Sequence, residues 1–200
     1  RREILDMMGL AGRFDATPSP LDESAVQSRL RSQPTVDPIV YTQTLAEEKA
    51  RALAETLDPP SDQKAILVLG SDTIVDLEGV ILEKPVDQED AIQTVGRLSG
   101  RQHYVHTGVA IYAVCPGSPA TCTKVVSFVD TATVTFAKLS TSDIEAYVKT
   151  GEPMDKAGSY GIQGVGGQLV ERVEGDFFTV MGLPMHRVSR ELSKAIRDLS

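Results

Sequence analysis

The segment AILVLGSDT, residues 65–73, is a short apolar run followed by a glycine and polar residues. A run of this length and uniform apolarity predicts a strand that is covered on both faces, as in an α/β sheet. Asp72 then stands at the carboxyl end of the strand, where open α/β sheets tend to place ligand groups. We therefore expect an α/β protein with Asp72 in or near its functional site.

The rest of the chain predicts strands and helices in alternation. Strands are expected at 14–24, where prolines turn the strand into a loop, at 74–77 and 80–82 as a hairpin, at 105–114 within the segment 101–114, and at 126–136 and 168–173. Helices are expected at 2–10, at 42–57, from the cap Asp87 to Gly100, from the cap Ser140 to Lys149, and from Pro184 onward. Residues 25–38 are expected to be an exposed connection, and residues 175–184 an apolar turn.

Composition limits the function classes. The 200 residues, 41% of them hydrophobic, suffice for a single domain. The formal charge of −8 disfavours a nucleic acid partner. No apolar run approaches the roughly 20 residues of a membrane span.

Cys115 and Cys122 are the two cysteines of the chain, and we expect them to be thiols in a reducing cytoplasm. A disulfide between them, across their loop, is the alternative. The chain opens with Arg1 and no signal peptide, as if its start were missing.

The segment EPMDKAGSYGIQGVGG, residues 152–167, contains five glycines among charged and amide side chains. This composition fits neither a regular helix nor a regular strand. Glycine at such density is typical of positive φ angles or of a backbone that another group approaches closely. The segment is therefore a candidate ligand loop, and the alternative is a solvated surface connection.

Three basic residues have two interpretations each. Arg1 and Arg2 precede a helix, where a bound anion would suit both the arginines and the free amides. They could equally be exposed side chains at the chain end. Lys49 lies on or beside the apolar stripe of its helix, so it either extends its ammonium to water or faces a functional cleft.

The polar residues at loop and strand ends suit hydrolysis of a nucleotide polyphosphate. Carboxylates can hold a hard divalent cation, and lysines and arginines can bind phosphate oxygens. A carboxylate near the metal can orient or deprotonate water. The chain has no G-x-x-x-x-G-K-S/T, G-x-S-x-G, C-x-x-C or H-E-x-x-H motif, and GIQGVGGQL misses the dinucleotide-binding spacing.

Several motifs, in order, resemble the Maf-like nucleoside triphosphate pyrophosphatases and match nearly from end to end. They are RREIL at 1–5, LAEEKA at 45–50, GSDTIV at 70–75, EKP at 83–85, LSGRQHYVHTGV at 98–109, EPMDKAGSYGIQG at 152–164 and GDFFTVMGLP at 175–184. The resemblance implies a mixed, twisted sheet flanked by helices, in two lobes with a cleft between them. It also implies a cytoplasmic homodimer that uses Mg²⁺ or Mn²⁺ to cleave a nucleoside triphosphate to the monophosphate and pyrophosphate.

The resemblance also implies a role for each matching residue. Asp72 matches the proton acceptor. Arg1, Thr73 and Gln163 match the positions that the dTTP/UTP branch of the family uses for substrate selection, so the resemblance favours pyrimidine substrates. An amide such as Gln163 can both donate to and accept from a pyrimidine edge. The implied catalytic residues are Asp72, Glu23, Lys49 and Lys84; the metal ligands Glu23, Asp72, Glu83 and Asp155; and the substrate-binding residues Arg1, Arg2, Thr73, Lys156 and Gln163. Asp22 could take the place of Glu23.

Two departures from the family pattern leave alternatives. The single domain expected over residues 1–200 lacks the apolar strand and Ser-x-Ser-Pro loop that precede the paired arginines in family members, and Thr179 stands where asparagine is expected. A non-catalytic nucleotide-binding or regulatory remnant is therefore one alternative. A pyrophosphatase acting on a modified purine nucleotide, 7-methyl-GTP, is another.

Overall fold

The computed structural model describes residues 1–33, 35–58, 65–117 and 121–199. The chain forms two compact units. Unit 1 comprises Arg1–Asp72, Thr107–Val129 and Gly182–Ser200, and unit 2 comprises Thr73–His106 and Asp130–Met181.

The sheet has five strands in the order β2-β1-β3-β4-β5. The strands are β1 (Ile66–Leu77), β2 (Val80–Leu82), β3 (Gln102–Cys115), β4 (Thr121–Phe136) and β5 (Val170–Glu174). The ladders β1/β2 and β4/β5 are antiparallel, with Val75 opposite Leu82 and Val134 opposite Val173. Together with the helices, this sheet confirms the predicted α/β class.

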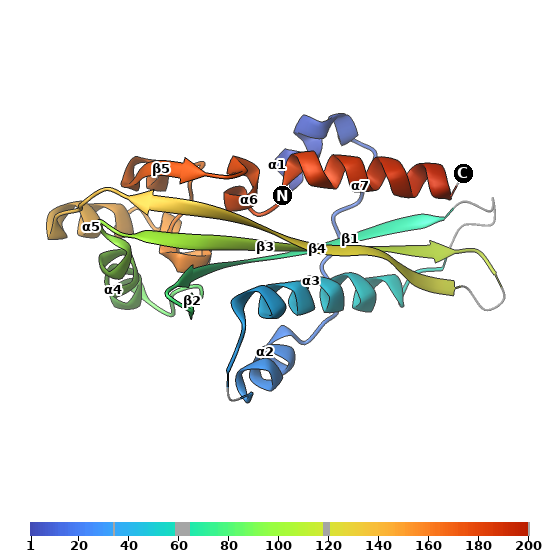
Figure 1. Ribbon diagram of the computed structural model, residues 1–200, viewed down its shortest axis with the longest axis horizontal. Helices are drawn as coiled ribbons and strands as arrows, with labels where there is room; N and C mark the ends of the chain where they lie inside the picture. The colour runs from blue at the N-terminus through green and yellow to red at the C-terminus, as the bar shows by residue number, and fades with distance from the viewer. Residues whose placement is uncertain (34, 59–64, 118–120, 200) are drawn as a thin grey trace. The chain divides into compact units, whose positions relative to one another are not determined.

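Helices and short turns connect the strands (Figure 1). The α-helices are α1 (Arg2–Leu5), α2 (Glu23–Arg31), α3 (Pro38–Ala54), α4 (Gln88–Leu98), α5 (Thr141–Val148), α6 (Phe177–Met181) and α7 (Met185–Asp198). A π-helical turn, η1 (Asp6–Leu10), extends α1, and the 3₁₀ turns η2 (Glu152–Asp155), η3 (Ala157–Ser159) and η4 (Val165–Leu169) follow α5.

In unit 1, α3 and α7 lie on opposite sides of the strands (Figure 1). A small apolar cluster joins α3 to the sheet through Ala50, Ala54, Val68, Ala110, Tyr112 and Val114. On the α7 side, the Arg187 guanidinium lies 4.1 Å from the centre of the Phe128 ring and donates to the Val129 carbonyl. Helices α3 and α7 thus contact the strands of unit 1 from two sides, and within the apolar run 65–69 only Val68 is fully buried.

The core of unit 2 contains a cluster of three rings. Phe136, Tyr160 and His103 meet edge to face, with centroids 4.8 to 5.5 Å apart. Around them pack apolar residues of α4, α5 and the strands, including Val95, Leu98, Val105, Val134, Ile144 and Val148. The Gly-rich segment therefore contributes a buried aromatic side chain, Tyr160, to this core.

Local sequence signals are confirmed at several places. Asp87 accepts from the Asp90 amide and caps α4, and Ser140 forms a reciprocal capping box with Asp143 at α5. The predicted hairpin forms, and its turn residues Glu78 and Gly79 both have positive φ angles, 56° and 82°. Cys115 and Cys122 are free thiols.

Four predictions are wrong. Strand β1 runs without a break from Ile66 to Leu77, so Asp72 lies within the strand and not at its carboxyl end. Residues 14–22 form no strand, since Pro18 and Pro20 provide no amide for a sheet ladder. Residues 23–31 form helix α2 instead of an irregular connection, because Asp22 caps it and Val26 and Leu30 bury one face. The apolar turn at 175–184 contains α6, whose first turn is capped by the Asp176 carboxylate at the Phe178 amide.

Candidate active site

The close contact between α3 and β1 depends on Gly70. A Cβ atom at this position would lie 2.6 Å from the Ala46 carbonyl oxygen and 2.7 Å from the Ala50 amide nitrogen. Such contacts with helix backbone leave no room for a side chain, so glycine lets the helix lie directly on the strand. Lys49 of α3 is thereby brought beside Asp72, two residues beyond the glycine.

Lys49 connects two carboxylates. Its Nζ atom lies 2.7 Å from Asp72 Oδ1 and 2.8 Å from Glu23 Oε2. The exposed fractions of the Lys49 and Asp72 side chains are only 15% and 13%, against 49% for Glu23. Water therefore screens the Lys49–Asp72 pair much less than a surface ion pair. The Lys49 ammonium thus faces two carboxylates and does not extend to water, while its role in a functional cleft stays a prediction.

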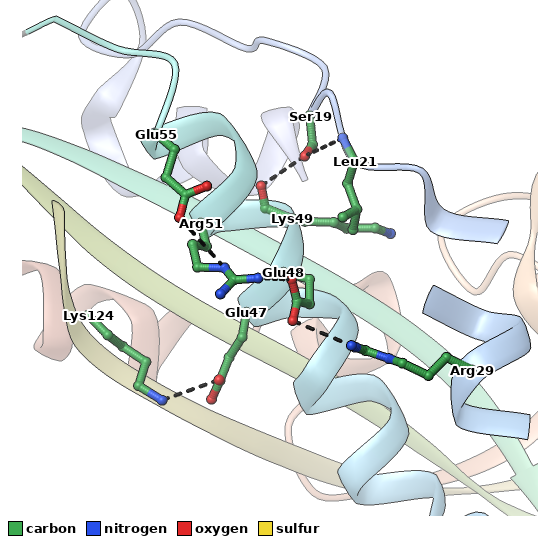
Figure 2. A network of polar contacts seen from close by, with 9 residues as sticks. All are labelled: Ser19, Leu21, Arg29, Glu47, Glu48, Lys49, Arg51, Glu55 and Lys124. Atoms are coloured by element: carbon green, nitrogen blue, oxygen red, sulfur yellow. Dashed lines mark hydrogen bonds and ion pairs between the residues drawn. The ribbon is translucent and has the colours of Figure 1, made fainter. Parts of the chain in front are cut away.

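The segment before α2 crosses α3 and brings Glu23 to Lys49. Ser19 Oγ donates to the Lys49 carbonyl over 2.9 Å and accepts from the Leu21 amide over 3.3 Å (Figure 2). Asp22 is occupied as the cap of α2, and hydrogen bonds from Ser24 and from the Ala25 amide lower the pKa of its carboxyl. Of the two adjacent acids, Glu23 is therefore the one at Lys49.

Arg1 belongs to the same charged group. Its Nε donates to the Gly182 carbonyl over 3.0 Å, and the Ser71 hydroxyl donates to the same oxygen over 3.0 Å. Desolvation lowers the pKa of the Arg1 guanidinium. The nearby carboxylates of Asp72 and Glu23 raise this pKa, but by less. The Arg2 residue is exposed on α1. Unit 1 thus collects Arg1, Glu23, Lys49 and Asp72 in one place.

Unit 2 holds a second group of predicted residues. Asp155 forms an ion pair with Lys156, and this hydrogen bond is the main reason that the pKa of Asp155 is lowered, with a smaller contribution from Lys84. The Glu83 carbonyl accepts from the Gly158 amide over 3.1 Å, which attaches the residues after β2 to the Gly-rich segment. Gln163 is exposed.

The glycines of residues 152–167 have internal packing reasons. Gly158 has a φ of 66°, and a Cβ there would lie 2.5 Å from a Val75 methyl carbon. At Gly166 and Gly167, a Cβ would lie 2.7 and 2.6 Å from oxygens of the protein itself. The segment is not a regular helix or strand, as predicted. Its glycine density does not require a ligand, because the segment folds tightly on its own side chains and on β1.

The donor set for a divalent cation is small. Among the described residues, no three histidine, cysteine, aspartate or glutamate side chains lie close enough together to form a metal site by themselves. Mg²⁺ usually takes one or two carboxylates and completes its shell with water and phosphate oxygens. Glu23 and Asp72 supply that number of carboxylates, and the Lys49 ammonium that now lies between them would have to move for a divalent cation to bind there.

Comparison with known proteins identifies the family. A family model described as Maf-like protein matches residues 1–195, so the chain belongs to the Maf-like family. A human "Probable bifunctional dTTP/UTP pyrophosphatase/methyltransferase protein" is 42% identical over 194 residues, which cover 97% of this chain and 30% of the human protein. The chain thus spans less than a third of that relative.

Two bacterial relatives have a length closer to that of this chain. The "dTTP/UTP pyrophosphatase" of Acholeplasma laidlawii is 41% identical over 96% of this chain and 90% of its own length. The protein of the same description from Moorella thermoacetica is 43% identical over 96% of this chain and 89% of its own length. No helix in the described part of the chain is long and apolar enough to cross a membrane.

Proposed function

We propose that this protein hydrolyses nucleoside triphosphates, with dTTP, UTP and related or modified pyrimidine nucleotides as substrates, to the monophosphate and pyrophosphate. The observation that carries the proposal is the group of Arg1, Glu23, Lys49 and Asp72, in which one ammonium lies within 2.8 Å of two carboxylates. Lys49 and Asp72 are largely shielded from water, and basic and acidic groups held together in this way can bind and activate a phosphoanhydride. The descriptions of the Maf-like relatives support the same reaction.

In this reaction, one water molecule is consumed and the bond between the α- and β-phosphates breaks. Asp72 accepts a proton from the attacking water. Lys49 holds the Asp72 carboxylate in place by a hydrogen bond, and the Thr42 hydroxyl donates to the Asp72 backbone carbonyl over 3.1 Å. Lys49 and Arg1 then bind phosphate oxygens and stabilise the charge that develops as the anhydride breaks.

A divalent cation, Mg²⁺ or Mn²⁺, is part of the proposal. Glu23 and Asp72 would hold it together with phosphate oxygens, and it would neutralise charge on the triphosphate. Glu83 and Asp155 of unit 2 stay predicted metal ligands. The exposed Asp155 carboxylate is engaged by Lys156, and this pair would have to open for Asp155 to bind a metal.

The remaining residues of unit 2 are assigned to substrate binding. Lys84 and Lys156 carry the positive charges for phosphate, while Thr73 and Gln163 select the base. Gln163 is exposed in a segment of fixed backbone, so its amide is available to donate to and accept from a pyrimidine. Arg2, exposed on α1, stays a predicted substrate contact.

The test is release of pyrophosphate from a panel of nucleoside triphosphates with Mg²⁺ or Mn²⁺. We expect turnover of dTTP and UTP, loss of turnover with a chelator, and a loss of about 100-fold or more in Asp72→Asn. Asp198→Asn, at the exposed end of α7, is the matched control and should retain full activity.

The alternatives are separated by the same panel. Nucleotide binding in calorimetry without turnover of any substrate would support a non-catalytic binding protein. Turnover of 7-methyl-GTP in preference to pyrimidine nucleotides would support the purine alternative. Turnover that persists after complete removal of divalent cations would contradict the metal requirement.

The proposal also includes a homodimer in the cytoplasm, for which the family resemblance is the support. Sedimentation equilibrium measures the association state directly, and a monomer at micromolar concentration would contradict it. Fractionation of cells that express the protein tests the location.

A further inference from the structure

Glu152 is the charged side chain of the Gly-rich segment that the proposed reaction does not use. Its carboxylate accepts three hydrogen bonds. Oε2 accepts from the Val165 amide over 2.8 Å, and Oε1 accepts from the Gly166 amide over 2.9 Å and from the Tyr147 hydroxyl over 3.1 Å. The two successive amides form a small anion-binding site of the backbone, which the protein fills with its own carboxylate.

Glycines enclose this carboxylate. A Cβ at Gly164 would lie 2.3 Å from Glu152 Oε2, and a Cβ at Gly161 would lie 3.3 Å from Glu152 Oε1. The Gly161 amide donates to the Tyr147 hydroxyl over 3.2 Å, and the Tyr147 side chain belongs to helix α5, where it is only 3% exposed. Glu152 and Tyr147 therefore hold both ends of the turn 161–166 against a rigid helix.

The exposed Gln163 lies inside this turn, two residues after Gly161 and two before Val165. Glu152 accepts from the amides of Val165 and Gly166, two and three residues after Gln163. Burial by itself would raise the pKa of Glu152, but the hydrogen bonds from Gly166, Val165 and Tyr147 lower it, so the group is held as an anion. Hydrogen bonds to a charged acceptor are the stronger kind.

We propose that Glu152 is a positioning residue for substrate selection: with Tyr147 it fixes the turn 161–166, and thereby the Gln163 amide that reads the pyrimidine base. Glu152 does not touch the substrate in this role, because both of its oxygens are engaged by the protein. The inference rests on the proposed function for its substrate, but the anchored turn can be tested without it.

Glu152→Gln is the main variant. A glutamine of the same shape places an NH₂ group against backbone N–H groups and removes the charge, so at least one of the three hydrogen bonds is lost. The backbone amides of Val165 and Gly166 should then exchange with solvent faster by about 10-fold or more, in the absence of any nucleotide. Glu171→Gln, an exposed glutamate of strand β5, is the matched control.

The kinetic readout separates positioning from general damage. We expect KM for UTP to rise about 10-fold in Glu152→Gln, the preference for UTP over GTP to fall by a similar factor, and kcat to change by less than about 3-fold. Tyr147→Phe removes one of the three hydrogen bonds and keeps the charge, so it should move the same quantities in the same direction by a smaller amount.

Two results would overturn the inference. One is a folded Glu152→Gln protein with unchanged KM, unchanged base preference and unchanged exchange at residues 165 and 166. The other is a fall of kcat and kcat/KM by equal factors for all nucleotides, which would indicate a direct role in the reaction. If Glu152→Gln does not fold, the same measurements of KM, base preference and amide exchange on Tyr147→Phe test the inference. If the unmodified protein turns over no nucleotide, the proposed function fails, while amide exchange still tests the anchor.

Discussion

The imidazole of His103 makes the stability of unit 2 depend on pH in a defined direction. His103 is 2% exposed, its Nε2 lies 2.9 Å from the Tyr160 hydroxyl oxygen, and the rings of Phe136 and Tyr160 meet it edge to face. Burial lowers the pKa of this histidine from 6.5 to about 4. The folded protein therefore keeps a neutral imidazole at pH values where the unfolded chain binds a proton.

The sign and size follow from linkage. Above pH 6.5, the histidine is neutral in both states and its contribution to stability is fully present. As the pH falls from 6.5 toward 4, the unfolded state takes up the proton first, and the free energy of unfolding decreases by up to about 1.4 kcal/mol per pH unit. Between pH 7 and pH 5, the loss from this one group is about 2 kcal/mol.

Urea unfolding of His103→Gln and of the unmodified protein at pH 7 and pH 5 measures this contribution. Glutamine keeps a hydrogen-bonding group near Tyr160 but cannot titrate, so the variant should lose about 2 kcal/mol less between the two pH values. Carboxylates that titrate in the same range affect both proteins alike. His186→Gln, at an exposed histidine, is the control. Equal pH dependence of His103→Gln and the unmodified protein would refute the reasoning.

Four further substitutions have defined outcomes. Gly108→Ala would place a Cβ 2.6 Å from the Thr42 carbonyl oxygen of α3, so urea unfolding should show a loss of about 1 to 3 kcal/mol. Lys49→Met removes the ammonium between the two carboxylates, and kcat/KM for UTP should fall about 100-fold with an unchanged circular dichroism spectrum. Ser140→Ala removes a capping box and should cost about 1 kcal/mol in urea unfolding. Ser159→Ala removes a buried hydroxyl that has no hydrogen-bond partner among the described residues, and should raise stability by about 1 kcal/mol.

Each of these has a result that contradicts it. A Gly96→Ala control, where a Cβ meets nothing within 4 Å, should not destabilise the protein, and a loss equal to that of Gly108→Ala would deny that contact with α3 is the cause. Full UTP turnover by Lys49→Met would remove Lys49 from the reaction. No loss in Ser140→Ala would show that water replaces the cap. A loss in Ser159→Ala would mean that its hydroxyl is satisfied after all.

Local signals in the sequence predicted the helix caps and the hairpin, because these features depend on interactions between residues only a few positions apart. Asp87 and Ser140 cap their helices through amides three residues ahead, and the positive φ angles at Glu78 and Gly79 close a hairpin between adjacent segments. Local signals did not predict α2, because its buried face consists only of Val26 and Leu30 and prolines precede and follow it.

The sequence by itself therefore determined the α/β class, the caps, the hairpin and the candidates Lys49 and Asp72. Only the tertiary structure decided that Glu23 rather than Asp22 faces Lys49, and that the glycines at 158–167 pack against Val75 and Glu152 instead of requiring a ligand. The physical reason is distance along the chain. A cap or a turn depends on its immediate neighbours, whereas these contacts exist only after strands and helices far apart in the sequence have packed in one register.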